Sequence, residues 1–196
     1  MNTTSHVTGT FADRRPPDRQ WRTRDILVVA VIAVAFGVFF WAFGVAWRAL
    51  EGLGPLLNVL YGFWLLPAIV APLIVRKPGA ALFAELVAAS LSAILGASWG
   101  IDVLVSGLLQ GGAAELVFAA FAYRRYTVPV LVLAALASAA AAFVHDWLVW
   151  YPAYSSDALL LIALFMGISA LVLIPAAALA LVGALRRAGV LEGFPA

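Results

Sequence analysis

The sequence predicts an all-α membrane protein, a bundle of six transmembrane helices with both termini in the cytosol. Hydrophobic residues make up 65% of the 196 positions and charged residues only 11%, whereas a soluble domain carries about 25% charged residues. The segments that connect successive apolar stretches alternate between many basic residues and few or none. Five basic residues lie in the N-terminal tail and two in each of three later turns, and Arg48 alone lies on the other side. The positive-inside rule makes the basic side cytosolic and the protein a multi-pass protein of the cell membrane.

The chain begins with a polar tail, residues 1–24, which we expect to be a disordered cytosolic segment because it holds few apolar residues. The membrane domain is expected at residues 25–187. Its first span, residues 25–47, has no charge between Asp25 and Arg48 and is long enough to cross a bilayer. Ala33 and Gly37 form a small-xxx-small pair, which lets helix backbones approach closely. This pair indicates either packing inside the bundle or a docking face for a partner helix.

The second span, residues 58–75, contains two prolines and carries aromatic side chains beside a polar one. An α-helical period places Asn58, Tyr61 and Leu65 on one face, with Trp64 beside them. Two interpretations of Tyr61 and Trp64 stay open: an aromatic belt at the membrane interface, or a wall of a pocket for an aromatic ligand.

The third and fourth spans, residues 80–95 and 101–123, carry the polar groups of the apolar region. Glu85 lies in the third span among alanines, which suit a slender helix inside a bundle. In the fourth span, a polar stripe recurs every four residues, at Asp102, Ser106 and Gln110. Glu115 lies about 140° around the same helix from Gln110. The two therefore face different neighbours unless the intervening glycines distort the helix.

The fifth and sixth spans are expected at residues 128–150 and 158–185, followed by a short cytosolic tail, residues 188–196. His145 and Asp146 lie near the end of the fifth span. They indicate either polarity at the membrane edge or a contact with a ligand at the rim of a pocket. Trp99 and Tyr151 lie in the loops expected on the outside.

Ionisable residues within membrane helices are costly and mark functional sites. The sequence contains no nucleotide-binding GxxxxGK[ST] motif, no HExxH motif and no cysteine, which argues against an enzyme, a metal site or a bound cofactor. Nothing in it suggests nucleic-acid binding. Carboxylates surrounded by aromatic rings suit a cationic aromatic ligand, because the rings add cation–π attraction of about 0.5 to 2 kcal/mol each.

Two sequence blocks carry a resemblance to a known family. The first is Arg76-Lys77-Pro78-Gly79-Ala80-Ala81-Leu82 followed by Glu85, and the second is Gln110-Gly111-Gly112-Ala113-Ala114-Glu115. Together with Tyr61-Gly62-Phe63-Trp64, they resemble the YkoE family of substrate-binding S components of energy-coupling factor (ECF) transporters. The resemblance extends in order from the first span to the sixth.

The resemblance implies a six-helix subunit that captures thiamine, or its hydroxymethylpyrimidine precursor, from outside. Its partners would be a membrane scaffold subunit and two cytosolic ATPase subunits, with Ala33 and Gly37 as candidates for docking. The motifs point to Glu85, Gln110 and Glu115 as substrate-binding residues. Chemistry and topology add further candidates, namely Tyr61, Trp64, Trp99, Asp146 and Tyr151. The alternative is a stand-alone, ion-coupled secondary transporter of a small cationic or aromatic solute.

Overall fold

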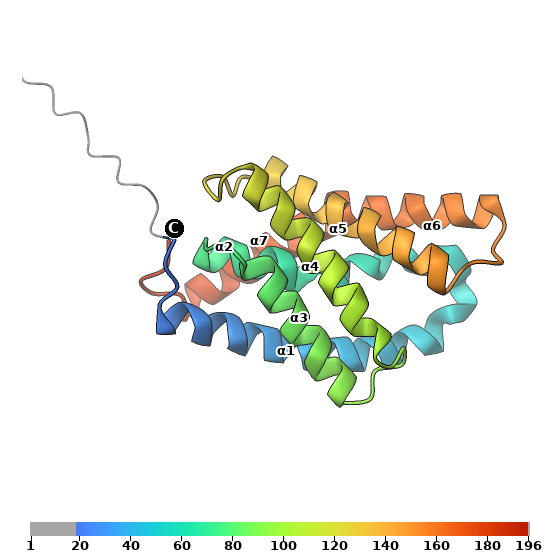
Figure 1. Cartoon of the computed structure of the whole chain (residues 1–196), viewed down its shortest axis with the longest axis horizontal. Helices are drawn as coiled ribbons and strands as arrows, with labels where there is room; N and C mark the ends of the chain where they lie inside the picture. Colours follow the sequence, from blue (N-terminus) through green and yellow to red (C-terminus); the bar gives the residue numbers. More distant parts are fainter. Residues whose placement is uncertain (1–18, 196) are drawn as a thin grey trace, which may run out of the picture.

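Residues 19–195 are described by a computed structural model, and within that range the chain forms helices and no strand (Figure 1). The elements in order are α1 (Thr23–Leu50), η1 (Glu51–Leu65), α2 (Leu66–Val75), α3 (Ala80–Ile94), α4 (Asp102–Ala120), α5 (Val128–Val149), α6 (Ser156–Ile168), η2 (Ser169–Leu173) and α7 (Ile174–Arg187). The disorder predicted for the N-terminal tail falls mainly on residues 1–18, which lie outside the described residues.

In the described part of the chain, four helical stretches are long and apolar enough to cross a membrane: Thr23–Val75, Asp102–Ala120, Val128–Val149 and Ser156–Arg187. Ala80–Ile94 is a shorter apolar helix. The first stretch is not one straight rod, because Gly54 has φ +57° and ψ −141°. The chain turns there, and α2 packs back against α1 (Figure 1). The prediction of an all-α, multi-pass membrane protein is confirmed.

The second predicted span differs from a regular α-helix. Residues 51–65 form the 3₁₀ helix η1, and only Leu66–Val75 is α-helical. In a 3₁₀ helix, residues three apart in sequence lie directly above one another. Pro55, Asn58, Tyr61 and Trp64 therefore share a face, whereas Leu65, which the α-helical period grouped with Tyr61, is fully buried in the core.

The last predicted span is also interrupted. A π-helical turn, η2, separates α6 from α7 and ends two residues before Pro175, whose nitrogen has no hydrogen to donate to a helix carbonyl. The hydroxyl of Ser169 in η2 accepts a hydrogen bond of 3.0 Å from the backbone N–H of Gly62 in η1. A side chain at Gly62 would lie 2.3 Å from Ile174. The backbone of η1 at Gly62 is therefore in direct contact with side chains of η2 and of the start of α7.

Helix α3 lies between α1 and α4 (Figure 1), and small residues set both contacts. Ala33 is fully buried, and a Cβ atom at Gly37 would lie 2.7 Å from the Cβ of Leu91 on α3. On the other side, a Cβ at Gly111 of α4 would lie 2.8 Å from the Cβ of Glu85. Ala33 and Gly37 thus take part in packing inside the bundle, and docking at this pair stays a prediction.

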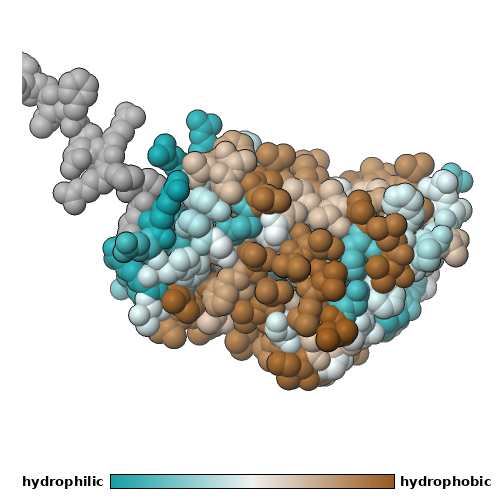
Figure 2. Space-filling model, in the orientation of Figure 1, coloured by the Kyte–Doolittle hydropathy of each residue, from teal (hydrophilic) through white to brown (hydrophobic). Residues whose placement is uncertain are grey.

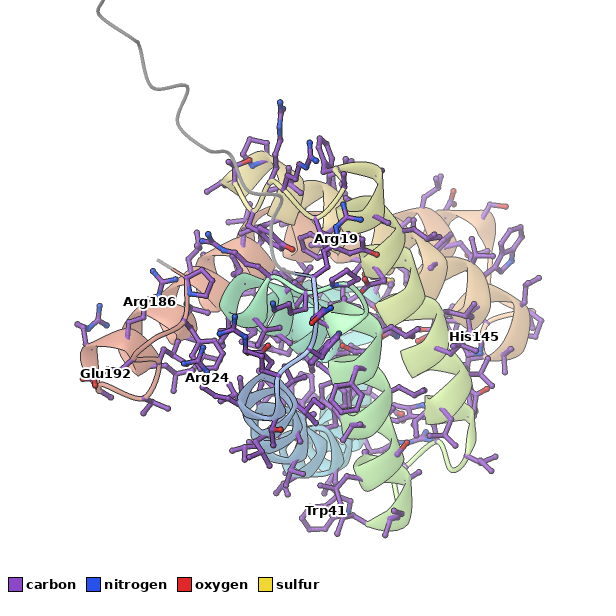
Figure 3. All side chains as sticks on the ribbon, turned by 60° about the vertical axis from the view of Figure 1, so that its left-hand side comes forward. Arg19, Arg24, Trp41, His145, Arg186 and Glu192 are labelled. Carbon is purple, nitrogen blue, oxygen red and sulfur yellow. The ribbon has the colours of Figure 1, made fainter. Side chains whose placement is uncertain are left out.

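The basic turns meet at one end of the bundle. The guanidinium of Arg19 donates to the carbonyl of Ala122, the Trp21 indole donates to that of Pro78, and Arg24 donates to that of Gly193. Figure 3 shows Arg24 and Arg186 at this end, away from His145. Hydrophilic side chains cover this end, and apolar side chains cover the middle of the molecule (Figure 2). This distribution is the one expected of a protein that spans a bilayer.

Candidate binding site

A cavity of about 370 Å³ lies between the helices, at the end of the bundle opposite to the basic turns. We call it the main cavity. Residues from α1, η1, α3, α4, α5 and α6 line it, together with the loops that precede α4 and α6. Its size falls within the range of pockets for small molecules. Seven of the eight predicted substrate-binding residues line it: Tyr61, Trp64, Glu85, Trp99, Gln110, Asp146 and Tyr151.

One wall of the main cavity is aromatic. The rings of Trp64 and Trp99 meet edge to face, with centroids 5.6 Å apart, and Phe40 packs 5.0 Å from Trp64. The guanidinium carbon of Arg48 lies 5.0 Å from the centre of the Trp99 ring. Gly44 makes room for this arrangement, because a Cβ atom there would lie 3.2 Å from Trp99. The wall offers flat rings on which an aromatic ligand can stack.

The 3₁₀ winding of η1 supplies a second wall. Pro55, Asn58, Tyr61 and Trp64 recur every three residues and all line the cavity. The amide nitrogen of Asn58 donates to the carbonyl of Pro55 at 3.1 Å. Its Oδ1 atom is buried and finds no hydrogen-bond partner among the described residues. This oxygen is available to a donor group of a ligand.

Glu85 reaches the cavity from α3 and is 1% exposed. Its Oε2 atom accepts a 3.0 Å hydrogen bond from the backbone N–H of Ala68, in the first turn of α2. This hydrogen bond favours the charged form of the carboxylate, whereas burial disfavours that form. Its Oε1 atom is buried and, within residues 19–195, has no hydrogen-bond partner. A buried acceptor without a donor is costly, and a ligand with an N–H group would remove that cost.

A chain of hydrogen bonds joins η1, α4 and α5 at the side of the cavity. The Tyr61 hydroxyl donates to Oδ2 of Asp146 at 2.8 Å, and the amide of Gln110 donates to the Tyr61 oxygen at 3.4 Å. The backbone carbonyl of Gln110 accepts a 2.8 Å hydrogen bond from the Ser138 hydroxyl of α5. This contact anchors α4 to α5. The chain fixes the orientation of the Asp146 carboxylate.

His145 lies behind this chain and does not line the cavity. Its Nδ1 atom is 3.1 Å from Oδ1 of Asp146, and its Nε2 atom is 3.2 Å from Oδ1 of Asp102. The second oxygen of Asp102 accepts a 2.9 Å hydrogen bond from the Trp150 indole. Asp102 of α4 also lines the cavity, and His145 connects it to Asp146 of α5.

Glu115 lies elsewhere. Its carboxylate accepts hydrogen bonds from the backbone N–H groups of Gly79 at 2.5 Å and Ala81 at 3.0 Å, at the N-terminus of α3. It does not line the main cavity, as the 140° separation from Gln110 allows. Burial, and secondarily the Glu115 carboxylate, raises the pKa of the nearby Tyr123 to about 12. The contacts of Glu115 are those of a helix cap, and a contact with ligand stays an untested prediction.

The sequence analysis missed several residues of the rim. Arg48 forms a 3.0 Å ion pair with Glu51, and its guanidinium also donates to the carbonyl of Ser98. Tyr154 packs against Tyr151 with ring centroids 4.8 Å apart and the ring planes tilted by 36°. Only the polarity of the loops could have indicated this rim. Across the described part of the chain, no group of three or more His, Asp or Glu residues is arranged to hold a metal ion.

Comparisons with known proteins agree with this geometry. Residues 24–141 match the family described as "ABC-type cobalt transport system, permease component". The YkoE protein of Bacillus subtilis (strain 168), proposed as an HMP/thiamine permease, is 36% identical over 179 residues, which cover 90% of each chain. A crystal structure of an S-component of an ECF transporter superposes with a TM-score of 0.84 at 36% identity, covering 89% of this chain and 90% of that one. With this identity over nearly its whole length and the same fold, the chain belongs to the YkoE family of ECF-transporter S components.

Proposed function

We propose that this protein is the membrane-embedded, substrate-binding subunit of an ATP-driven ECF vitamin importer, and that the main cavity binds thiamine or its hydroxymethylpyrimidine precursor. The observation that carries the proposal is the main cavity, in which buried carboxylates stand against an aromatic wall. The name of the Bacillus subtilis relative, an HMP/thiamine permease, supports the choice of ligand. As an S component the chain is not an enzyme, and ATP is hydrolysed by partner subunits.

The chemistry of the cavity fits both halves of thiamine. The thiazolium ring carries a permanent positive charge, which Asp102 and Asp146 complement. The aminopyrimidine ring carries N–H donors, and the unpartnered oxygens of Glu85 and Asn58 are acceptors. Flat rings stack on Trp64 and Trp99. A small number of well-placed polar groups in a largely apolar pocket is typical of small-molecule sites.

The proposed topology has six spans, with both termini cytosolic and the main cavity opening to the outside. The turn at Gly54 supports it, because it divides the first apolar stretch into two passes. The gathering of the basic turns at the end opposite to the cavity supports the orientation, by the positive-inside rule. In the described part of α1, only Arg48, at its last turn, places a basic side chain near the rim of the cavity.

The proposed partners are a membrane scaffold subunit and two cytosolic ATPase subunits. The chain has no nucleotide-binding motif of its own, so energy must come from outside it. Docking at Ala33 and Gly37 requires the bundle to rearrange, because Ala33 is fully buried and Gly37 packs against α3.

Titration calorimetry of the purified protein with thiamine and with hydroxymethylpyrimidine tests the proposal. We expect at least one of them to bind with micromolar or tighter affinity, as a specific pocket of this kind allows. Absence of binding by both would refute the proposed ligand class. Uptake measured in vesicles with and without the ATPase partners separates the importer from a secondary transporter, which would transport without them.

A further inference from the structure

The position of His145 between two carboxylates has a consequence for protons. Both ring nitrogens face carboxylate oxygens, Nδ1 at 3.1 Å from Asp146 and Nε2 at 3.2 Å from Asp102. A neutral imidazole has one N–H donor and one acceptor nitrogen, and an ionised carboxylate only accepts. A neutral ring between two ionised carboxylates would therefore leave one acceptor facing another at hydrogen-bond distance.

One proton more than a neutral ring carries would remove this acceptor–acceptor contact. The hydrogen bonds on the outer oxygens of the two carboxylates indicate where that proton lies. Asp146 receives the Tyr61 hydroxyl on Oδ2 at 2.8 Å, and Asp102 receives the Trp150 indole N–H on Oδ2 at 2.9 Å. Hydrogen bonds donated to a carboxylate favour its charged form. These bonds hold the outer oxygens as acceptors, so an additional proton lies between the imidazole ring and the inner carboxylate oxygens. Imidazole is the more basic of these groups, and the proton therefore lies on His145 as imidazolium, with an N–H directed at each aspartate.

Ser106 offers one alternative arrangement. Its Oγ atom lies 3.3 Å from Nδ1 of His145, so the hydroxyl could donate to a neutral ring. In that arrangement Oδ1 of Asp146 would still face the lone pair of Nδ1 at 3.1 Å. The imidazolium form removes this repulsion, and the Ser106 oxygen then accepts rather than donates.

Within residues 19–195, no lysine or arginine forms an ion pair with Asp102 or Asp146. The arginine at the cavity rim, Arg48, is already bound to Glu51 and to the carbonyl of Ser98. From η1 the titratable neighbour is Tyr61, and from the loop before α6 it is Tyr151, which lies in the field of Asp146. Glu85 of α3 acts on Tyr61 from the cavity side.

The other helices that pack against α5 bring no further charged group to Asp102, His145 or Asp146. Helix α2 and η2 have no titratable side chain in their sequences, and the one acid of α6, Asp157, lies exposed in its first turn. The arginines of α7 are in its last turn, at the basic end. Among the described residues, His145 is therefore the positive group that contacts Asp102 and Asp146.

The two aspartates separate His145 from the main cavity. Asp102 and Asp146 both line it, whereas His145 contacts them from behind. A cation in the cavity would be drawn to the same two carboxylates. Two positive charges would then share them in a partly buried space, where their mutual repulsion is only weakly screened.

We propose that Asp102, His145 and Asp146 hold one exchangeable proton on the imidazole, and that a cation bound in the main cavity competes with this proton. One ligand cation enters, and one proton leaves His145 for the solvent, so that the charge of the complex does not change. The identity of the cation, thiamine, rests on the proposed function. Linkage requires the converse as well, so lowering the pH weakens binding of the cation.

The first test is calorimetry of the full chain with thiamine, in buffers that differ in ionisation enthalpy. The buffer dependence of the binding enthalpy counts the protons released. We expect release of up to one proton for each thiamine bound, and a Kd that rises by up to tenfold for each unit by which the pH falls over the range in which release is observed. Hydroxymethylpyrimidine, which lacks the thiazolium charge, should release none at about pH 8. Thiamine binding without proton release and without pH dependence would overturn the proposal.

A His145→Gln variant keeps a donor for one aspartate and cannot hold the proton. We expect its thiamine binding to release no proton. The matched control is His6→Gln, which removes the other histidine of the chain and should keep the wild-type proton release. Release that persists in His145→Gln would place the proton elsewhere and overturn the assignment.

A second measurement does not depend on ligand binding or on the folding of a variant. In ligand-free protein labelled with ¹⁵N-histidine, the nitrogen shifts distinguish an imidazolium from either neutral tautomer. We expect both nitrogens of His145 to be protonated at about pH 7, and the addition of thiamine to shift the ring toward a neutral form. A neutral ring in the ligand-free protein would overturn the proposal. If neither ligand binds, the proposed function fails, whereas these shifts still decide whether the proton is stored.

Discussion

The two glutamates of the apolar region have different surroundings at the scale of single residues. Glu85 holds the first turn of α2 with one oxygen and directs the other toward the main cavity without a partner. Glu115 uses its oxygens on the backbone at the start of α3. Two glutamates in similarly apolar helices thus differ in geometry: Glu85 faces the cavity, whereas Glu115 caps a helix. Substitution by glutamine separates these roles, because it removes charge and keeps shape.

We predict that Glu85→Gln weakens thiamine binding by roughly 10-fold to 100-fold, since a buried polar group left without a partner costs about 1 to 3 kcal/mol. The glutamine oxygen can still accept from Ala68, which would direct its NH₂ group at the ligand's own N–H donors. Titration calorimetry measures the change. An unchanged Kd would show that the ligand does not donate to Glu85.

We predict that Glu115→Gln lowers the stability of the protein by about 1 kcal/mol, because a negative charge at the N-terminus of α3 is lost. The Kd for thiamine should stay within about twofold of the wild-type value, as expected for a surface remote from the cavity. Thermal unfolding followed by tryptophan fluorescence and calorimetry give the two values. A larger loss of affinity for cationic thiamine than for the neutral pyrimidine would instead support the ligand contact predicted from the sequence.

At the scale of elements, the winding of η1 decides which side chains form a wall. Four cavity residues recur every three positions, Pro55, Asn58, Tyr61 and Trp64, and only a 3₁₀ helix superposes that spacing. In an α-helix, each step of three residues turns by about 60° short of a full circle. Trp64 would then point away from Pro55, and Leu65 would take its place.

The chain has no cysteine, so single cysteines can report this face. We predict that a cysteine at Asn58 or Trp64 reacts with a small water-soluble thiol reagent, and that thiamine protects it, because both positions line the cavity. A cysteine at Leu65, which is fully buried in the core, should not react. Equal labelling at 64 and 65, or protection at 65 alone, would argue for the α-helical period.

Two adjacent glycines of α4 test the contact between α3 and α4. A Cβ atom at Gly111 would lie 2.8 Å from the Cβ of Glu85, whereas a Cβ at Gly112 would meet nothing within 4 Å. We predict that Gly111→Ala destabilises the protein by about 1 to 3 kcal/mol and weakens thiamine binding by displacing Glu85. Gly112→Ala is the matched control and should be neutral or stabilising by up to about 1 kcal/mol. Equal effects in thermal unfolding would contradict the close packing.

At the scale of the whole molecule, charge separates the two ends of the bundle, and this separation predicts its orientation in the membrane. We expect a cysteine at Ser156, near the cavity end and exposed, to react with a membrane-impermeant reagent applied to intact cells. A cysteine at Ala188, after α7 and also exposed, should react only after the cells are permeabilised. The reverse pattern would place the main cavity in the cytosol and contradict the importer.

Hydropathy and charge along the chain determine much of this protein. The helical class depends on apolar length, because a bilayer forces every backbone polar group to be satisfied within the helix. Seven of the eight predicted binding residues line one cavity. For the charged and amide side chains among them, the reason is that contact with lipid is costly, so they face the interior of the bundle. Their part in binding stays a prediction. Local pattern suffices for these inferences, and the short motifs indicate the family that the comparisons establish.

Tertiary structure alone decided the rest. Packing against η2 accompanies the 3₁₀ winding of η1 and places Trp64 rather than Leu65 beside Tyr61. Contacts between distant segments gave Glu85 and Glu115 their different partners and enclosed His145 between Asp102 and Asp146. These relations depend on which helices touch and at what depth. A sequence period describes the face of one helix and carries no information about the neighbour that covers it.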